Sequence, residues 1–135
     1  MGQSQTENAG PRRILVVDDD LDILESTALV LRSEGYEVET VDRGADVLRA
    51  ARRERPRLVL LDMRMPDMSG IEVCSALKQD PELRTIPIVA FSADRGMAER
   101  MGEVSVVGFL QKPLDFDDLV RTIERHASHD PTKRA

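Results

Sequence analysis

The segment Leu58–Gly70, with the sequence LVLLDMRMPDMSG, combines signals that together favour one class of fold. It opens on a run of apolar residues, which is typical of a strand buried on both faces of a parallel sheet. The run ends at Asp62, and a loop containing Pro66 follows. Ser69 and Glu72 then have the capping-box spacing that begins a helix. A buried strand, a loop and a helix in this order indicate a parallel sheet covered by helices.

The same alternation of strand and helix continues on both sides of this segment. Five strand–helix pairs can be assigned, which predicts an α/β fold with a doubly wound five-stranded parallel sheet. In such sheets the strand order is commonly 2-1-3-4-5, and the ligand crevice lies at the carboxyl ends of strands 1 and 3. The other strands are predicted at Ile14–Val17, around Val38, at Ile88–Phe91 and at Val104–Leu110, and helices are predicted to begin near Leu21, Ala45, Ile71, Met97 and Phe116.

Length and composition favour a single globular domain. The chain has 135 residues, of which 1–11 and 128–135 are predicted to be disordered tails and 12–127 the folded domain. The net charge of −6 argues against general binding to nucleic acid or membranes. Cys74 is the only cysteine and lies on an apolar helical face, so we expect a buried, inert thiol. No signal peptide or membrane span is recognisable, and the expected location is the cytoplasm.

Polar residues follow four of the five predicted strands directly, at the edge where loops usually carry function. Carboxylates gathered there repel one another unless a cation lies among them, and Mg²⁺ prefers oxygen ligands. A carboxylate, a divalent ion, an ammonium and a hydroxyl together suit phosphoryl transfer. The residues at these strand ends are Asp18, Asp19 and Asp20 after strand 1, Asp62 after strand 3, Ser92 followed by Ala93 after strand 4, and Lys112 followed by Pro113 after strand 5.

Each of these residues also has a structural interpretation. Asp20 is best explained as a helix cap, and Ser92 fits a helix cap as well. Asp62 taken alone fits a turn before Pro66, and an isolated Lys112 is most often a solvated lysine. The functional interpretation is preferred because the strand ends coincide at one edge of the sheet.

With these residues at its strand ends, the chain resembles the receiver domain of two-component response regulators. The resemblance covers about residues 12–127 and implies the 2-1-3-4-5 strand order. The matching strings are ILVVDDD at Ile14–Asp20, LVLLDMRMPDMSG at Leu58–Gly70, IPIVAFSA at Ile86–Ala93 and GFLQKPLD at Gly108–Asp115.

The resemblance implies a phosphoacceptor with a metal ion beside it. Asp62 matches the aspartate that receives the phosphoryl group. The Mg²⁺ (or Mn²⁺) ligands implied are Asp18, Asp19, Asp62 and the backbone carbonyl of Arg64.

The resemblance also implies a phosphorylation switch. Ser92 matches the switch hydroxyl, Phe109 the switch aromatic and Lys112 the lysine that pairs with the phosphoryl group. The remaining positions implied are Ala93 beside the phosphoryl group, a cis peptide between Lys112 and Pro113, and Arg64 and Asp94 as residues that tune phosphoryl lifetime and whose charges can pair. The partner-binding surface would comprise the fourth helix (near Met97), the fifth strand and the fifth helix (from Phe116).

The resemblance implies a cytoplasmic signalling phosphoprotein rather than an enzyme. It would take a phosphoryl group from a histidine kinase or phosphotransfer protein and dephosphorylate itself. With no output domain visible after residue 127, we expect it to act on a downstream protein, without direct DNA binding or membrane insertion. A monomer that can dimerise on phosphorylation is expected.

Two other functions stay open on the sequence. One is a degenerate receiver that serves only as a scaffold, although every expected acidic, hydroxyl and lysine position is filled. The other is a phosphohydrolase that forms an aspartyl phosphate, as haloacid-dehalogenase-like proteins do, because Asp18 and Asp20 have the spacing of their paired acids.

Overall fold

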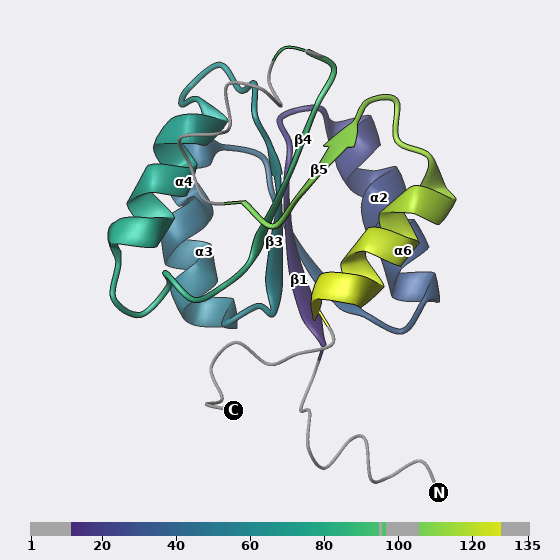
Figure 1. Cartoon of the computed structure of the whole chain (residues 1–135), viewed down its shortest axis with the longest axis horizontal. Coiled ribbons are helices and arrows are strands. Elements are labelled where there is room, and N and C mark those ends of the chain that lie inside the picture. Colours follow the sequence, from purple (N-terminus) through teal and green to yellow (C-terminus); the bar gives the residue numbers. More distant parts are fainter. Residues whose placement is uncertain (1–11, 95, 97–105, 128–135) are drawn as a thin grey trace, which may run out of the picture.

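Five parallel strands form the centre of the protein, in the order β2-β1-β3-β4-β5 (Figure 1). The computed structural model describes residues 12–94, 96 and 106–127. The strand order confirms the doubly wound α/β fold expected from the sequence. The strands are β1 (Arg13–Val17), β2 (Glu37–Val41), β3 (Leu58–Asp62), β4 (Ile88–Ser92) and β5 (Gly108–Gln111).

Helices cover both faces of the sheet, with α3 and α4 on one side and α2 and α6 on the other (Figure 1). The helix predicted near Met97 and Met101 lies outside the described residues, and so do the predicted tails, 1–11 and 128–135. No helix in the described ranges has the length and apolar character needed to cross a membrane. The helices are α2 (Leu21–Ser33), α3 (Val47–Glu54), which follows the short 3₁₀ helix η1 (Gly44–Asp46), α4 (Gly70–Gln79) and α6 (Phe116–Ala127).

The central strands are continuous apolar runs because both of their faces are buried. Alternate side chains of a strand point to opposite faces of the sheet, so each strand contributes to two cores. Ile14 and Leu58 pack in the core under α2 and α6, whereas the next residues, Leu15 and Val59, pack in the core under α3 and α4. All four side chains are fully buried.

The two edge strands differ from the central ones. Most of β2 is exposed or half-buried, as its alternating sequence predicts. A strand was predicted over Val104–Leu110, but β5 begins at Gly108, after Val106 and Val107; residues 104 and 105 lie outside the described residues. Val107 donates its backbone N–H to Ile88 O at 2.9 Å, yet its side chain is 45% exposed. Apolar character alone therefore did not mark where regular strand pairing begins.

Side-chain caps fix where the helices begin after the strands. The Asp20 carboxylate accepts hydrogen bonds from two backbone N–H groups in the first turn of α2. Ser69 and Glu72 form the predicted capping box of α4. Gly35, which follows α2, has a φ of +95°, a left-handed conformation that glycine adopts readily. The caps at Asp20 and Ser69 hold the starts of α2 and α4 at the carboxyl edge of the sheet.

The buried Cys74 thiol lies inside the core under α3 and α4. Burial raises its pKa to about 11. The thiol therefore stays protonated near neutral pH, which agrees with the inert cysteine expected from the sequence.

Gly70 brings the start of α4 against the loop that follows β3. A Cβ atom at Gly70 would lie 2.5 Å from the backbone Cα of Met63 and 2.6 Å from its sulfur atom. Gly70 also donates its backbone N–H to Met63 O at 3.0 Å. Since Met63 directly follows Asp62, this close contact fixes the path of the chain at the end of β3.

Replacing Gly70 by alanine should therefore destabilise the fold. We expect Gly70→Ala to lower the free energy of unfolding by about 1–3 kcal/mol, the usual cost of forcing extra atoms into a packed site. Urea denaturation measures this change.

Gly108→Ala is the matched control, because a Cβ atom there would meet its nearest neighbour, Thr122 Cγ2, at 3.6 Å. Removing a glycine from a strand should raise stability by up to about 1 kcal/mol. Equal stabilities for the two variants would contradict the close packing described at Gly70.

Candidate functional site

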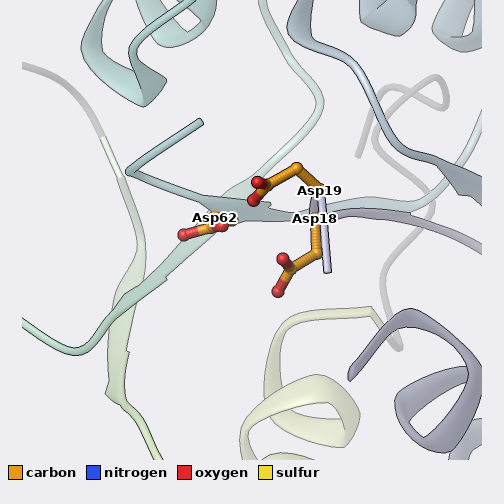
Figure 2. A group of neighbouring side chains, drawn as sticks. All are labelled: Asp18, Asp19 and Asp62. Atoms are coloured by element: carbon orange, nitrogen blue, oxygen red, sulfur yellow. The ribbon is translucent and has the colours of Figure 1, made fainter. Parts of the chain in front are cut away.

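Two buried carboxylates lie side by side at the carboxyl edge of the sheet. β1 and β3 are neighbours, and their last paired residues, Val17 and Leu61, are followed by Asp18 and Asp62. Asp18 is 0% exposed and Asp62 is 2% exposed, whereas Asp19 is exposed to solvent. One carboxylate oxygen from each of these three residues lies within 4.8 Å of the others (Figure 2).

Backbone hydrogen bonds hold the two buried aspartates in place. Asp18 donates its backbone N–H to Val41 O at 3.1 Å, and its Oδ1 accepts a hydrogen bond from the backbone N–H of Asp20 at 2.9 Å. Asp62 Oδ1 accepts a hydrogen bond from the backbone N–H of Arg64 at 3.1 Å. The positions of both carboxylates are therefore set by the fold and not by flexible side chains.

Lys112 provides the positive charge next to these carboxylates. Its backbone N–H donates to Ser92 O at 2.9 Å, and the peptide bond that joins it to Pro113 is cis, as the resemblance implies. Its Nζ lies 3.0 Å from Asp18 Oδ2 and 3.5 Å from Asp62 Oδ2. The lysine side chain is only 17% exposed, so this ammonium is largely shielded from solvent.

The pKa of Asp62 is raised from 3.8 to about 7. Burial is the main cause and the nearby charge of Asp18 adds to it, while the N–H of Arg64 and the charge of Lys112 act in the opposite direction. Without a metal ion, ionised Asp62 therefore opposes folding. This penalty is fully present above pH 7 and is relieved as the pH falls from about 7 toward 4.

The residues at this edge fit a hard divalent cation. Three carboxylates face one ammonium, which leaves an excess of negative charge in a largely buried position. Mg²⁺ prefers oxygen ligands and commonly keeps several waters, and the exposed side chain of Asp19 leaves the site open to solvent. A role for the Arg64 carbonyl as a further ligand stays a prediction.

Ser92 and its neighbours border the same site. Ser92 ends β4, is 1% exposed and accepts a hydrogen bond through Oγ from the backbone N–H of Asp94 at 3.0 Å. Ala93 is exposed beside it. Arg64 Nη1 lies 3.5 Å from Asp94 Oδ2, which forms the ion pair expected from the sequence. Because the Arg64 side chain is 67% exposed, this pair adds little to stability.

Phe109 lies on the same face of the sheet as Ser92. The strand register pairs Phe109 with Ala90, and Ser92 follows Ala90 by two residues, so the side chains of these three residues share one face. Phe109 is half-buried and packs against the core under α3 and α4. A switch role for Phe109 and Ser92 stays a prediction.

The structure confirms one expectation about the surroundings of the site and adds two contacts that sequence reasoning missed. Asp20 caps α2, as expected, because its Oδ1 accepts two backbone hydrogen bonds from the first turn of that helix. Sequence reasoning missed Asp67, which accepts backbone hydrogen bonds from Gly44 and Ala45; these bonds lower its pKa and anchor the loop after β3. It also missed the contact between Lys112 and the ring of Phe91, which no periodicity reveals.

Comparison with known proteins gives a consistent result. The family model described as "Response regulator receiver domain" matches residues 14–124. The polar-differentiation response regulator DivK of Brucella anthropi is 31% identical over 118 residues, which are 86% of this chain and 96% of DivK. The structure of the chemotaxis protein CheY4 of Vibrio cholerae is similar with a TM-score of 0.81 and 28% identity, covering 87% of this chain and 99% of CheY4.

Some relatives are longer than this chain. The DNA-binding response regulator MtrA of Mycolicibacterium paratuberculosis is 45% identical over 114 residues, which are 83% of this chain and 49% of MtrA. The chain thus spans nearly all of DivK but about half of MtrA.

The carboxylate site predicts a pH-dependent response to Mg²⁺. At about tenfold its dissociation constant, Mg²⁺ should stabilise the fold by about 1.4 kcal/mol and raise Tm by about 3–6 °C at pH 8. The increase should shrink at pH 5, where Asp62 is protonated before the ion binds. Differential scanning fluorimetry measures both shifts.

Asp62→Asn should lose most of the Mg²⁺-induced increase because it removes one of the three carboxylates. Glu82→Gln is the control, since Glu82 is exposed beyond the end of α4 that points away from the site. An equal increase in both variants would exclude Asp62 from the ion site.

Proposed function

The chain belongs to the family of response regulator receiver domains, and we propose that it accepts a phosphoryl group on Asp62 in the presence of Mg²⁺. The donor would be a histidine kinase or a phosphotransfer protein of a two-component system. The observation that carries this proposal is the placement of Asp62, buried at the end of β3 with Asp18, Asp19 and the Lys112 ammonium around it.

The transfer assigns a role to each group around Asp62. An Asp62 carboxylate oxygen attacks phosphorus, and the bond between phosphorus and the donor atom breaks as the new bond forms. Asp18, Asp19, Asp62 and the Arg64 carbonyl would hold the ion. Bound Mg²⁺ supplies positive charge that offsets the charge on the phosphoryl oxygens. Lys112 supplies positive charge from the side of β5, where it already contacts Asp18 and Asp62.

The same geometry supports a switch between two states. The new phosphoryl group adds negative charge and hydrogen-bond acceptors next to Ser92. The Ser92 hydroxyl and the adjacent backbone at Ala93 would turn toward that group, and Phe109 would move into the space that Ser92 leaves. Because Phe109 lies on β5, this movement would alter the surface formed by the helix predicted near Met97, β5 and α6. Partners would bind to this surface.

Arg64 and Asp94 would set the lifetime of the phosphorylated state. Their ion pair joins the loop after β3, which begins next to Asp62, to the loop after β4. The two side chains would control how water reaches the phosphoryl group. The only chemical activities proposed for the chain are this self-dephosphorylation and phosphorylation from small phosphodonors.

The proposed partners are a phosphodonor and a downstream protein. The DNA-binding description belongs to MtrA, about half of which this chain matches. The net charge of −6 does not favour direct DNA binding by this chain. A cytoplasmic monomer that dimerises through the switched surface on phosphorylation completes the proposal.

The phosphohydrolase alternative is weaker than the receiver interpretation. It requires an acid two residues after the nucleophile that transfers a proton, whereas Asp20 Oδ1 is held by two backbone N–H groups at the start of α2. The scaffold alternative requires an incomplete site, whereas the carboxylates, the lysine and the serine all lie at one edge of the sheet.

Intact mass spectrometry after incubation with acetyl phosphate and Mg²⁺ tests the proposal. We expect the mass of one phosphoryl group to be added to the wild type and none to be added to Asp62→Asn. EDTA should also abolish the adduct, because the buried carboxylates need the ion to receive further negative charge.

Asp20→Asn is the matched control, because asparagine caps helices as well as aspartate does. It should retain the adduct under the receiver interpretation, in which the adduct depends on Asp62. Under the phosphohydrolase interpretation the nucleophile is Asp18, so Asp62→Asn would still gain an adduct. A wild-type chain that gains no adduct and does not bind beryllofluoride would contradict the phosphoacceptor role of Asp62.

A further inference from the structure

The aromatic ring of Phe91 faces the ammonium group of Lys112, which also contacts Asp62. Lys112 Nζ is 4.8 Å from the centroid of the ring, within the distance at which a cation is attracted to an aromatic face. Phe91 is fully buried in the core under α2 and α6. The strand register pairs it with Asp62, and Met63 donates its backbone N–H to Phe91 O at 3.0 Å.

The sheet topology explains why the lysine crosses this ring. Lys112 follows β5, whereas its two carboxylate partners lie at the ends of β3 and β1. Since β4 lies between β5 and β3, the lysine side chain must pass over the end of β4 to reach them. Phe91 is the penultimate residue of β4, so its ring forms the surface over which the ammonium is held.

An aromatic face can hold the ammonium without accepting one of its hydrogen bonds. The attraction comes from the ring quadrupole and is spread over the face, so it tolerates small movements of the cation. A polar side chain in the same place would hold one N–H donor in a fixed direction. With the ring beneath it, Lys112 keeps its donors for Asp18, for Asp62 and for an incoming anion.

We infer that Phe91 is a positioning residue for phosphoryl transfer, because its ring face holds the Lys112 ammonium where an anion on Asp62 will meet it. This inference rests on the proposed function and adds a residue to it. The site around Asp62 thereby includes an aromatic support on β4 in addition to the charged groups on β1, β3 and β5.

Replacing Phe91 by a smaller residue would leave a cavity in the core, so a shape-preserving series is the better test. Mono-, tri- and pentafluorophenylalanine at position 91 progressively weaken the quadrupole of the ring while keeping its outline. Beryllofluoride affinity with Mg²⁺ and the rate of phosphorylation by acetyl phosphate are then measured. Both should fall stepwise, by about three- to thirtyfold across the series, the range expected for a partly desolvated cation–ring contact.

A second measurement isolates the contact itself. The unfolding equilibrium constant of the same ring series is determined in the wild-type background and in Lys112→Met. We expect fluorination to favour unfolding progressively when Lys112 is present and to have a much smaller graded effect in Lys112→Met, where no cation faces the ring.

The outcomes separate the inference from the function on which it rests. If wild type binds beryllofluoride and neither its affinity nor the phosphorylation rate changes across the series, Phe91 is a core residue only and the inference is wrong. A graded effect on unfolding without a graded effect on beryllofluoride affinity or phosphorylation rate also overturns it. If the wild type fails to bind beryllofluoride, the proposed function fails, while the unfolding series still reports on the contact.

Discussion

The buried pair Asp18 and Asp62, with the Lys112 ammonium between them, is the constraint on which the rest of the site depends. Two ionised carboxylates this close in a shielded position repel each other, so either positive charge compensates them or one of them takes up a proton. The sheet order makes the arrangement possible because β1 and β3 are neighbours and end at the same level. Burial and the Asp18 charge nevertheless leave Asp62 with a raised pKa, so one lysine does not compensate the site fully. The site is therefore arranged to gain a further cation.

The surrounding loops hold this incompletely compensated site in place at the edge of the sheet. Asp20 and Ser69 fix the starts of the helices that follow β1 and β3. The close contact of Gly70 with Met63 and the hydrogen bonds of Asp67 fix the path of the loop after Asp62. Much of the cost of placing the charges is thus met by backbone contacts formed when the protein folds, before any ion or phosphoryl group arrives.

The sequence predicted the parts of this account that follow from periodicity and local chemistry. Apolar runs ending in polar residues located the sheet edge, and the caps at Asp20 and Ser69 followed from residue type and spacing. The raised pKa of Asp62 did not follow, because it depends on burial and distances between strands that are far apart in the sequence. The contact of Lys112 with Phe91 depends on how a side chain crosses a neighbouring strand, and the start of β5 depends on backbone pairing. Neither leaves a mark in the pattern of apolar residues.

The most direct test of this account is the titration of the Asp62 carboxyl carbon by ¹³C NMR, assigned with Asp62→Asn and followed in EDTA and in Mg²⁺. In EDTA we expect a pKa of about 7 for Asp62, because burial and the charge of Asp18 disfavour the charged form. In Mg²⁺ the pKa should fall well below that value, since the ion stabilises the carboxylate. A pKa near the ordinary 3.8 in EDTA, or one that Mg²⁺ leaves unchanged, would contradict the claim that an uncompensated buried carboxylate defines this site.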